Sequence, residues 1–383
     1  MTDNKKLKAA LDLIYLVSCA VNEVKPDKEI CSNMELADVY DCMRQHALSA
    51  AAACALEQVI ELPDDIKEAK YKAFRRVSML NVERARILSE LEACGIWYMP
   101  MKGIVLMDYY PITAMREMSD NDILCDSSRM ADVRTVMEDL GFKCISFGKI
   151  HHDVYEKPLQ IEFEMHRSFF ERIKHPELFA YYENIKERLI KDSDNSFGYH
   201  MTNDDMYIYL ICHLHNHYEK MGIGLRSLLD IYMFHKRCGN ALDSSYLDAE
   251  LNKLELSKFE SKVRLLAEKT FSFAELSENE LSMLGFFIDS GSHGTVENIM
   301  MSKLQNDDSG KAKSKYLLKR VFPSREDLKR NHPTVYRHKA LYPLWLAYRP
   351  IRGVLTHPKG IVREIRRLKK FKKKDNNANK IER

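Results

Sequence analysis

Two aspartates stand two positions apart at the start of a short stretch, 120–125, whose last three residues are apolar. Aspartate is poorly suited to strand interiors, so Asp120 and Asp122 in one predicted strand indicate a role other than packing. Residues i and i+2 of a strand project from the same face, about 6.6 Å apart. Two carboxylates on one face repel each other and are costly to bury without a cation. A divalent ion such as Mg²⁺, with hard oxygen ligands, would remove that cost.

A third acidic group is available in the predicted hairpin that follows, with arms at 152–156 and 159–166. In the second arm Glu162, Glu164 and His166 alternate with apolar residues, so they share one face of the strand. A neighbouring strand would bring Glu164, or Glu162 as its substitute, opposite the aspartates. Three carboxylates around two metal ions form an arrangement that activates an attacking oxygen and stabilises a leaving pyrophosphate.

Basic and glycine residues that suit phosphate precede the aspartates. Lys102 and Gly103 lie at a predicted junction between a strand and a helix, where free backbone N–H groups and the helix dipole attract phosphate. Arg116, four residues before Asp120, could brace the phosphates of a bound nucleotide.

This order of motifs resembles the uncharacterised nucleotidyltransferase family of the DNA polymerase β-like superfamily. Lys102 and Gly103 match the glycine region of the nucleotide loop, Asp120 and Asp122 match the metal-binding pair, and Glu164 matches the third acid. The resemblance implies a mixed sheet flanked by helices. It also implies Mg²⁺-dependent transfer of a nucleoside monophosphate from an NTP to an acceptor hydroxyl on RNA, a protein or a small molecule. The resemblance covers 94–170 and, with a similar downstream segment, reaches about residue 240.

Three positions depart from the pattern of the wider superfamily. Ile104 follows Gly103, so the loop lacks a second glycine or a serine hydroxyl for the phosphate. Asn121 stands between the aspartates, where an apolar, sheet-packing residue is usual. The third acid is a glutamate rather than the commoner aspartate.

Three histidines, His213, His215 and His217, also raise the question of a metal site. Only His213 and His217 share a helix face, and no HExxH acid accompanies them, so the spacing favours a helix packed on the sheet over a zinc site. His213 and His166 are expected to face the nucleotide.

The composition favours an α+β chain rich in helix, because only 14 of its 383 residues are glycine. We predict a small mixed β-sheet nucleotidyltransferase core flanked by N-terminal and C-terminal helical regions. The predicted divisions are 1–93 helical, 94–190 core, 191–335 helical and 336–383 an amphipathic, basic tail. Alternation predicts strands at 96–101, 120–125, 142–147, 152–156 and 159–166. Helical periodicity predicts helices at 127–140, 204–217, 225–237, 246–269 and 278–288.

The N-terminal segment shows helical periodicity over 5–92. Leu11 and Ile14 fall on one predicted apolar face near its start, and Val82 falls on another near its end. The sequence Leu16-Val17-Ser18-Cys19 looks like a lipoprotein cleavage box, but Asp12 interrupts the apolar run, so we predict an ordinary helix.

Nine scattered cysteines with no CxxC motif favour reduced thiols and a cytoplasmic protein. The segment 363–374 carries eight Lys or Arg and one Glu. This basic stretch, 361–374 with its apolar residues, could contact an anionic membrane or nucleic acid, or could simply be a solubilising end. An alternative to the enzyme is therefore a non-catalytic nucleotide-binding protein of the same fold, tethered by this tail.

Overall fold

The structure is a computed structural model that describes residues 3–118, 121–220 and 222–291, together with Leu328, 333–338 and six residues between 342 and 349. The chain divides into two compact units. The first comprises Met1–His217 with Ile223–His293, and the second comprises Tyr218–Gly222 with Gly294–Arg383. Most of the predicted tail, including 361–374, lies outside the described residues. Helix α17 (Pro333–Arg337) belongs to the second unit.

A five-stranded mixed sheet lies in the first unit, with the strand order β1-β2-β5-β4-β3. Only β2 and β5 run parallel, and each other neighbouring pair is antiparallel. The strands are β1 (Tyr98–Pro100), β2 (Asn121–Cys125), β3 (Lys143–Ser146), β4 (His152–Lys157) and β5 (Ile161–His166). A separate antiparallel pair is formed by β6 (Ile190–Lys191) and β7 (Tyr199–His200).

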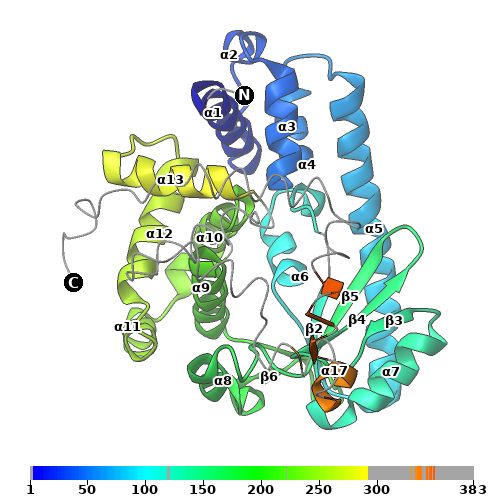
Figure 1. Ribbon diagram of the computed structural model, residues 1–383. Coiled ribbons are helices and arrows are strands. Elements are labelled where there is room, and N and C mark those ends of the chain that lie inside the picture. The colour runs from blue at the N-terminus through cyan, green and yellow to red at the C-terminus, as the bar shows by residue number, and fades with distance from the viewer. Residues whose placement is uncertain are drawn as a thin grey trace. The chain divides into compact units, whose positions relative to one another are not determined.

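Helices precede, interrupt and follow this sheet, which confirms the predicted α+β class (Figure 1). The N-terminal helices are α1 (Asp3–Val21), α2 (Lys28–Ser32), α3 (Leu36–His46), α4 (Ser49–Leu56) and α5 (Asp64–Ala93). Those between strands are α6 (Gly103–Leu106) and α7 (Met130–Asp139). After β5 come α8 (Pro176–Tyr182), α9 (Asn203–Lys220), α10 (Leu225–Cys238), α11 (Ser244–Lys253), α12 (Ser257–Phe271) and α13 (Glu278–Ser290).

The two faces of the sheet differ sharply in chemistry. Ile123 of β2 and Phe163 and Met165 of β5 are buried in one apolar cluster with residues of α5 and α7. In Figure 1 the lower part of α5 and α7 lie on one side of the sheet, and α9 and α10 lie on the other. Because side chains alternate along a strand, Asp122 of β2 and the polar residues of β5 point to the side away from this core.

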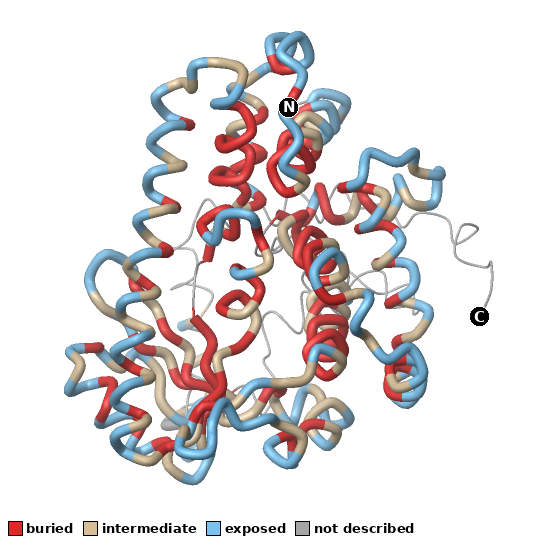
Figure 2. The backbone as a smooth tube through the Cα atoms, turned by 180° about the vertical axis from the view of Figure 1, so that it is seen from behind, coloured by how far each residue is buried: buried red, intermediate tan, exposed pale blue. Residues whose placement is uncertain are grey.

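The N-terminal helices pack around α4, which is buried along its whole length (Figure 2). Two predicted apolar faces were wrong in detail. On the first face Ile14 is buried as predicted, but Leu11 is 43% exposed, and the buried side of α1 also carries Leu13 and Val17. Val82 is 61% exposed, because it lies off the buried stripe of α5. This stripe runs along one continuous helix of 30 residues and continues through Ile87.

The predicted helix 246–269 was also wrong as a single element. The chain forms α11 and α12 there, separated at Leu254, Glu255 and Leu256. Glu255 has a left-handed φ of 58°, which a continuous helix does not allow.

All nine cysteines are free thiols, as the sequence predicts. Within the described part of the chain, no helix combines the length and the apolar character needed to cross a membrane. The segment that looks like a cleavage box is the interior of α1, where Ser18 and Cys19 are buried.

We predict that His46, buried at the end of α3, makes the protein less stable in acid. Its Nδ1 accepts a hydrogen bond from the Leu225 N–H at 3.3 Å, and burial lowers its pKa to about 4. The unfolded chain binds a proton below about pH 6.5 while folded His46 stays neutral, so stability falls as the pH drops from 6.5 to 4. The loss reaches roughly 3 kcal/mol, counted at about 1.4 kcal/mol per unit of pKa difference.

Urea unfolding of wild type and His46→Gln at pH 7 and pH 4.5 measures this term. The loss of stability between the two pH values should be smaller for His46→Gln, whereas a variant of the exposed His200, His200→Gln, should lose as much as wild type. Equal losses in wild type and His46→Gln would contradict the assignment.

Candidate functional site

The hydrogen-bond ladder between β2 and β5 aligns the predicted acidic residues. Asp122 lies directly opposite Glu164 in the parallel register, and Leu124 lies opposite His166. Glu162 instead lies opposite Glu156 of β4. Glu164, rather than its substitute Glu162, is therefore the acid that the fold brings to Asp122. Asp120 lies outside the described residues, so its place at the site stays a prediction.

Asp122 is the most strongly held group of the site. It is 5% exposed, and its Oδ1 accepts hydrogen bonds from Lys102 Nζ and His166 Nε2, each at 2.8 Å. Burial alone would raise the pKa of this carboxyl, but the charge of Lys102 and the hydrogen bonds from His166 and Lys102 hold it well below its usual range. Asp122 is therefore ionised in the folded protein.

Glu164 joins the histidines of β4 and β5 to the same cluster. Its two oxygens lie 3.3 Å from His166 Nε2 and 3.5 Å from His152 Nε2. Burial disfavours the charged form of His166, but its bonds to Asp122 and Glu164 outweigh burial and raise its pKa. Burial and the charge of His166 lower the pKa of His152 to about 4. Burial, with the charges of His166 and His152, lowers the pKa of His151 to about 2.

The donor set suits a divalent cation. One ligand atom each from Asp122, Glu164 and His166 lies within 4.8 Å of the others. Two carboxylates on paired strands are the protein ligands that Mg²⁺ commonly takes, with water and substrate phosphate completing its shell. The cluster therefore could bind a metal, as the sequence predicts.

The turn between β1 and α6 presents the predicted phosphate-binding residues. Lys102 has φ 48° and ψ −117°, a conformation that residues with a side chain rarely adopt. Its Nζ reaches across to Asp122, and Gly103 begins α6 directly after it. Ile104, which departs from the superfamily pattern, is buried in the apolar cluster and anchors this short helix.

Arg116 lies beside Gly103 but is paired with a helix downstream. Its Nε and Nη2 donate to the two carboxylate oxygens of Asp230 in α10, each at 2.8 Å, and the Tyr110 hydroxyl donates to Asp230 at 2.8 Å. Its Nη1 packs against Gly103 so closely that a methyl group there would collide with it. The predicted phosphate contact of Arg116 stays a prediction, and the structure adds a positioning role.

The segment that leads into the aspartates is fixed by contacts from three other helices. Glu117 accepts the Ala50 N–H at the start of α4 at 2.9 Å, and burial raises the pKa of this carboxyl. Arg226 of α10 donates to the Glu117 carbonyl at 2.7 Å, and Arg76 of α5 donates to the Met118 carbonyl at 2.8 Å. Residues 117 and 118 are therefore each bonded to other helices of the unit.

Asn121, the second departure, points to the opposite side of the sheet from Asp122. It is fully buried, and its Oδ1 accepts a hydrogen bond from Arg84 of α5 at 3.1 Å. The polar residue between the aspartates thus has a partner in the helical layer and takes no part in the acidic cluster.

Helix α9 places His213 within the electrostatic influence of Lys102 and Asp122, and its contact with a nucleotide stays a prediction. Burial and the nearby charge of Lys102 hold the pKa of His213 well below its usual value. His213 and His217 contact each other with ring centroids 4.5 Å apart, and neither joins a group of potential metal ligands among the described residues. Sequence reasoning missed Tyr209, one turn earlier in α9, whose buried hydroxyl lies in the field of Lys102 and Asp122. A tyrosine in an apolar helix gives no signal of this placement.

A family model described as an uncharacterised nucleotidyltransferase matches residues 32–272, which is more than half of the chain. The chain belongs to this nucleotidyltransferase family. The match extends the predicted resemblance in both directions, from α2 to the residue after α12. Comparisons with curated proteins and with solved structures gave no match.

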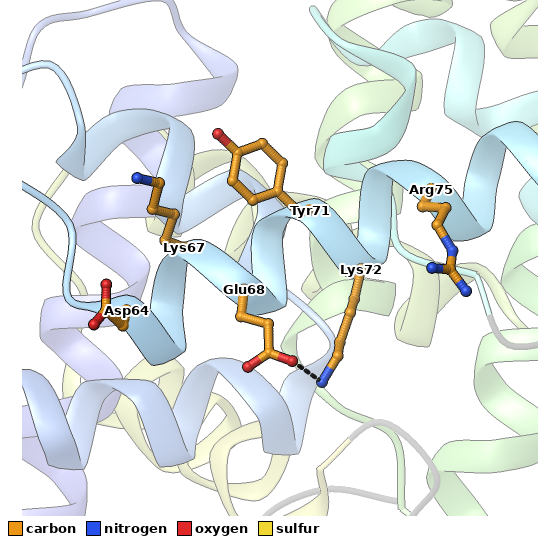
Figure 3. Close-up of a pocket in the computed structure, with 6 residues that line it drawn as sticks. All are labelled: Asp64, Lys67, Glu68, Tyr71, Lys72 and Arg75. Carbon is orange, nitrogen blue, oxygen red and sulfur yellow. Dashed lines mark ion pairs between the residues drawn. The ribbon is translucent and has the colours of Figure 1, made fainter.

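Two surface hollows of this nucleotidyltransferase family member lie apart from the cluster. One, of about 480 Å³, runs along the first half of α5, where Lys67, Tyr71 and Arg75 line it (Figure 3). The other, of about 440 Å³, lies between the end of α5 and α7 and includes Cys94 and Arg129. Neither contains a residue of the Asp122 cluster.

Loss of Asp230 should destabilise the protein strongly. Asp230→Ala leaves the buried guanidinium of Arg116 without this counter-charge, so we expect the free energy of unfolding to fall by about 3–5 kcal/mol. The control Glu138→Ala removes an exposed pair with Arg134 and should cost less than about 1 kcal/mol. Urea unfolding measures both, and equal losses would show that the buried pair is not special.

Gly103→Ala should displace Arg116. The added methyl would collide with Arg116 Nη1 and lie 3.1 Å from Met118 sulfur, which costs about 1–3 kcal/mol by overpacking. Gly285→Ala in α13 meets no atom within 4 Å and should instead stabilise by about 0.5–1 kcal/mol. Opposite shifts in the urea midpoint are expected, and two shifts of the same sign would refute the steric argument.

Proposed function

We propose that this protein transfers a nucleoside monophosphate from an NTP to an acceptor hydroxyl in a Mg²⁺-dependent reaction. The observation that carries the proposal is the alignment of Asp122 with Glu164 on paired strands, next to Lys102 and His166. A buried carboxylate beside a partly exposed one, with an ammonium group at their edge, suits a triphosphate and its cation.

Asp122 and Glu164, with Asp120 from the same strand, would hold the metal. Mg²⁺, when bound, neutralises the developing charge on the phosphates. Lys102, the Gly103 amide and Arg116 bind phosphate oxygens, and the partly exposed Lys102 can turn from Asp122 to the triphosphate. His166 and His213 line the nucleotide side of the cluster.

In the reaction the acceptor oxygen forms a bond to the α-phosphorus, and the bond from the α-phosphorus to the bridging oxygen breaks. Pyrophosphate leaves with that oxygen. Glu164 orients the acceptor hydroxyl and takes its proton. The acceptor class, whether RNA, protein or small molecule, is left open by this chemistry. The basic segment 361–374 would steer an anionic acceptor or hold the protein at an anionic membrane. The free thiols support a cytoplasmic location.

A second candidate is nucleotide binding without transfer. It is favoured by one observation, that Lys102 and His166 both already donate to the same oxygen of Asp122. A protein that keeps these bonds would be stabilised thermally by NTP and would release no pyrophosphate.

Removing the Asp122 charge should abolish transfer. Asp122→Asn, incubated with Mg²⁺, α-labelled NTPs and a cell extract as the source of acceptor, should transfer less than about 1% of the label that wild type transfers, since such charge stabilisation is worth about 10²–10³ in rate. The matched control Glu162→Gln alters an acid on the same strand outside the cluster and should keep its activity.

Three results would each overturn a part of this proposal. Undiminished transfer by Asp122→Asn refutes the site. Equal losses in Glu162→Gln and Asp122→Asn refute the choice of Glu164. Thermal stabilisation of wild type by NTP with no label transferred and no pyrophosphate released supports the binding candidate instead.

A further inference from the structure

Three imidazoles meet where β4 begins and β5 ends. His152 lies directly opposite His166 in the antiparallel ladder, and the Arg167 N–H donates to the His151 carbonyl at 2.9 Å, which fixes His151 beside them. The ring centroids are 4.6, 4.9 and 5.4 Å apart, and one nitrogen from each ring lies within 4.8 Å of the other two. The backbone ladder therefore places the three rings together.

The spacing of the ring nitrogens fits two ligands of one ion. His151 Nε2 and His152 Nδ1 are 3.4 Å apart. Ordinary N–H···O hydrogen bonds measure about 2.7–3.2 Å, so this separation is long for a hydrogen bond. Two nitrogens bound to a tetrahedral Zn²⁺ at about 2.05 Å each lie about 3.3 Å apart. Small movements of these rings would complete such a pair.

The far nitrogen of His166 already has the kind of partner that metal-binding histidines use, and a carboxylate lies near the far nitrogen of His152. His166 Nε2 lies 2.8 Å from Asp122 Oδ1, and His152 Nε2 lies 3.5 Å from Glu164 Oε1. Metal-binding histidines commonly donate the second ring N–H to a carboxylate, which fixes the tautomer and leaves the other nitrogen for the metal.

Two ring nitrogens of this cluster, His151 Nδ1 and His166 Nδ1, are buried without a hydrogen-bond partner among the described residues. His166 as a whole is 1% exposed. A buried polar atom of this kind costs free energy unless a ligand, ion or water satisfies it. Because Nε2 is held by Asp122, Nδ1 is the nitrogen that His166 can offer.

We propose that His151, His152 and His166 bind a transition-metal ion of the Zn²⁺ type. The ligand atoms are His151 Nε2, His152 Nδ1 and His166 Nδ1, with water or an exogenous group in the fourth position. Imidazole nitrogens favour Zn²⁺, Ni²⁺ or Cu²⁺ over Mg²⁺, which prefers oxygen, so this site and the carboxylate site select different ions. The bound ion would tie the start of β4 to the end of β5.

This site has its own test, which needs no nucleotidyl transfer, and two of its three ligands lie outside the Asp122 cluster. It shares His166 with the Asp122 cluster, but His151 and His152 belong to it alone among the two groups of potential metal ligands found in the described residues. Binding of the metal can be measured with no nucleotide present, so the two proposals can fail independently.

The test uses the full chain without an affinity tag, stripped with a chelator, and titrated with Co²⁺ in the presence of excess Mg²⁺. We expect about one equivalent of Co²⁺ to give the visible absorption of a four-coordinate site, and Zn²⁺ to displace it. Zn²⁺ should also raise the Tm of wild type. His151→Ala should lose the absorption band, bind Zn²⁺ at least about tenfold more weakly and lose the rise in Tm.

The control His200→Ala removes an exposed histidine that pairs with Asp192, so it should bind Co²⁺ as wild type does. The Tm of each metal-free variant shows whether it is folded, and His152→Ala replaces His151→Ala if the latter is not. A wild-type protein that binds no Co²⁺ in the presence of Mg²⁺ would overturn the proposal. So would folded His151→Ala or His152→Ala that binds Zn²⁺ as tightly as wild type.

Discussion

Strands β2 and β5 run side by side in the same direction, and their ladder sets Asp122 opposite Glu164 and Ile123 opposite Met165. The charged contacts between Asp122, Glu164 and His166, and the packing of the sheet on α5 and α7, depend on that pairing. A slip of one residue in either strand would turn its acidic side chains into the layer formed by α5 and α7 and bring its apolar residues among the charges. The apolar cluster thus enforces the register, and the register assembles the site.

The site is stable because its charges are compensated locally. A buried carboxylate is costly unless it is paired and hydrogen-bonded, and Asp122 has both an ammonium and an imidazole on one oxygen. Lys102, which supplies the ammonium group, itself has an unfavourable backbone conformation. Such strain costs about 1–3 kcal/mol and persists only where the surroundings enforce it. Here the surroundings are β1, the buried Ile104 and the packed guanidinium of Arg116.

Much of this arrangement could be predicted from the sequence, because it depends on local periodicity. Alternation in the second arm of the hairpin separated Glu164 from the core residues, and the order of Lys102, Asp122 and Glu164 indicated the family. What could not be predicted depends on register and tertiary packing. The partner of Arg116 is Asp230, 114 positions later, and no local pattern links them. The cluster of three histidines could not be predicted without the strand ladder that puts His152 opposite His166. The exposure of Val82 could be predicted only if α5 were known to be one long helix, and no cap within the segment indicates that length.

The buried Arg116–Asp230 pair has a consequence for how this protein can be divided. Asp230 belongs to α10, which lies beyond the predicted core at 94–190, yet it holds the residue that packs against Gly103. A fragment cut after the sheet would lose both the carboxylate that pairs with this guanidinium and the helix that carries it. The sheet is therefore not a module that could be excised or grafted, and the smallest piece that can be autonomous must run through α10.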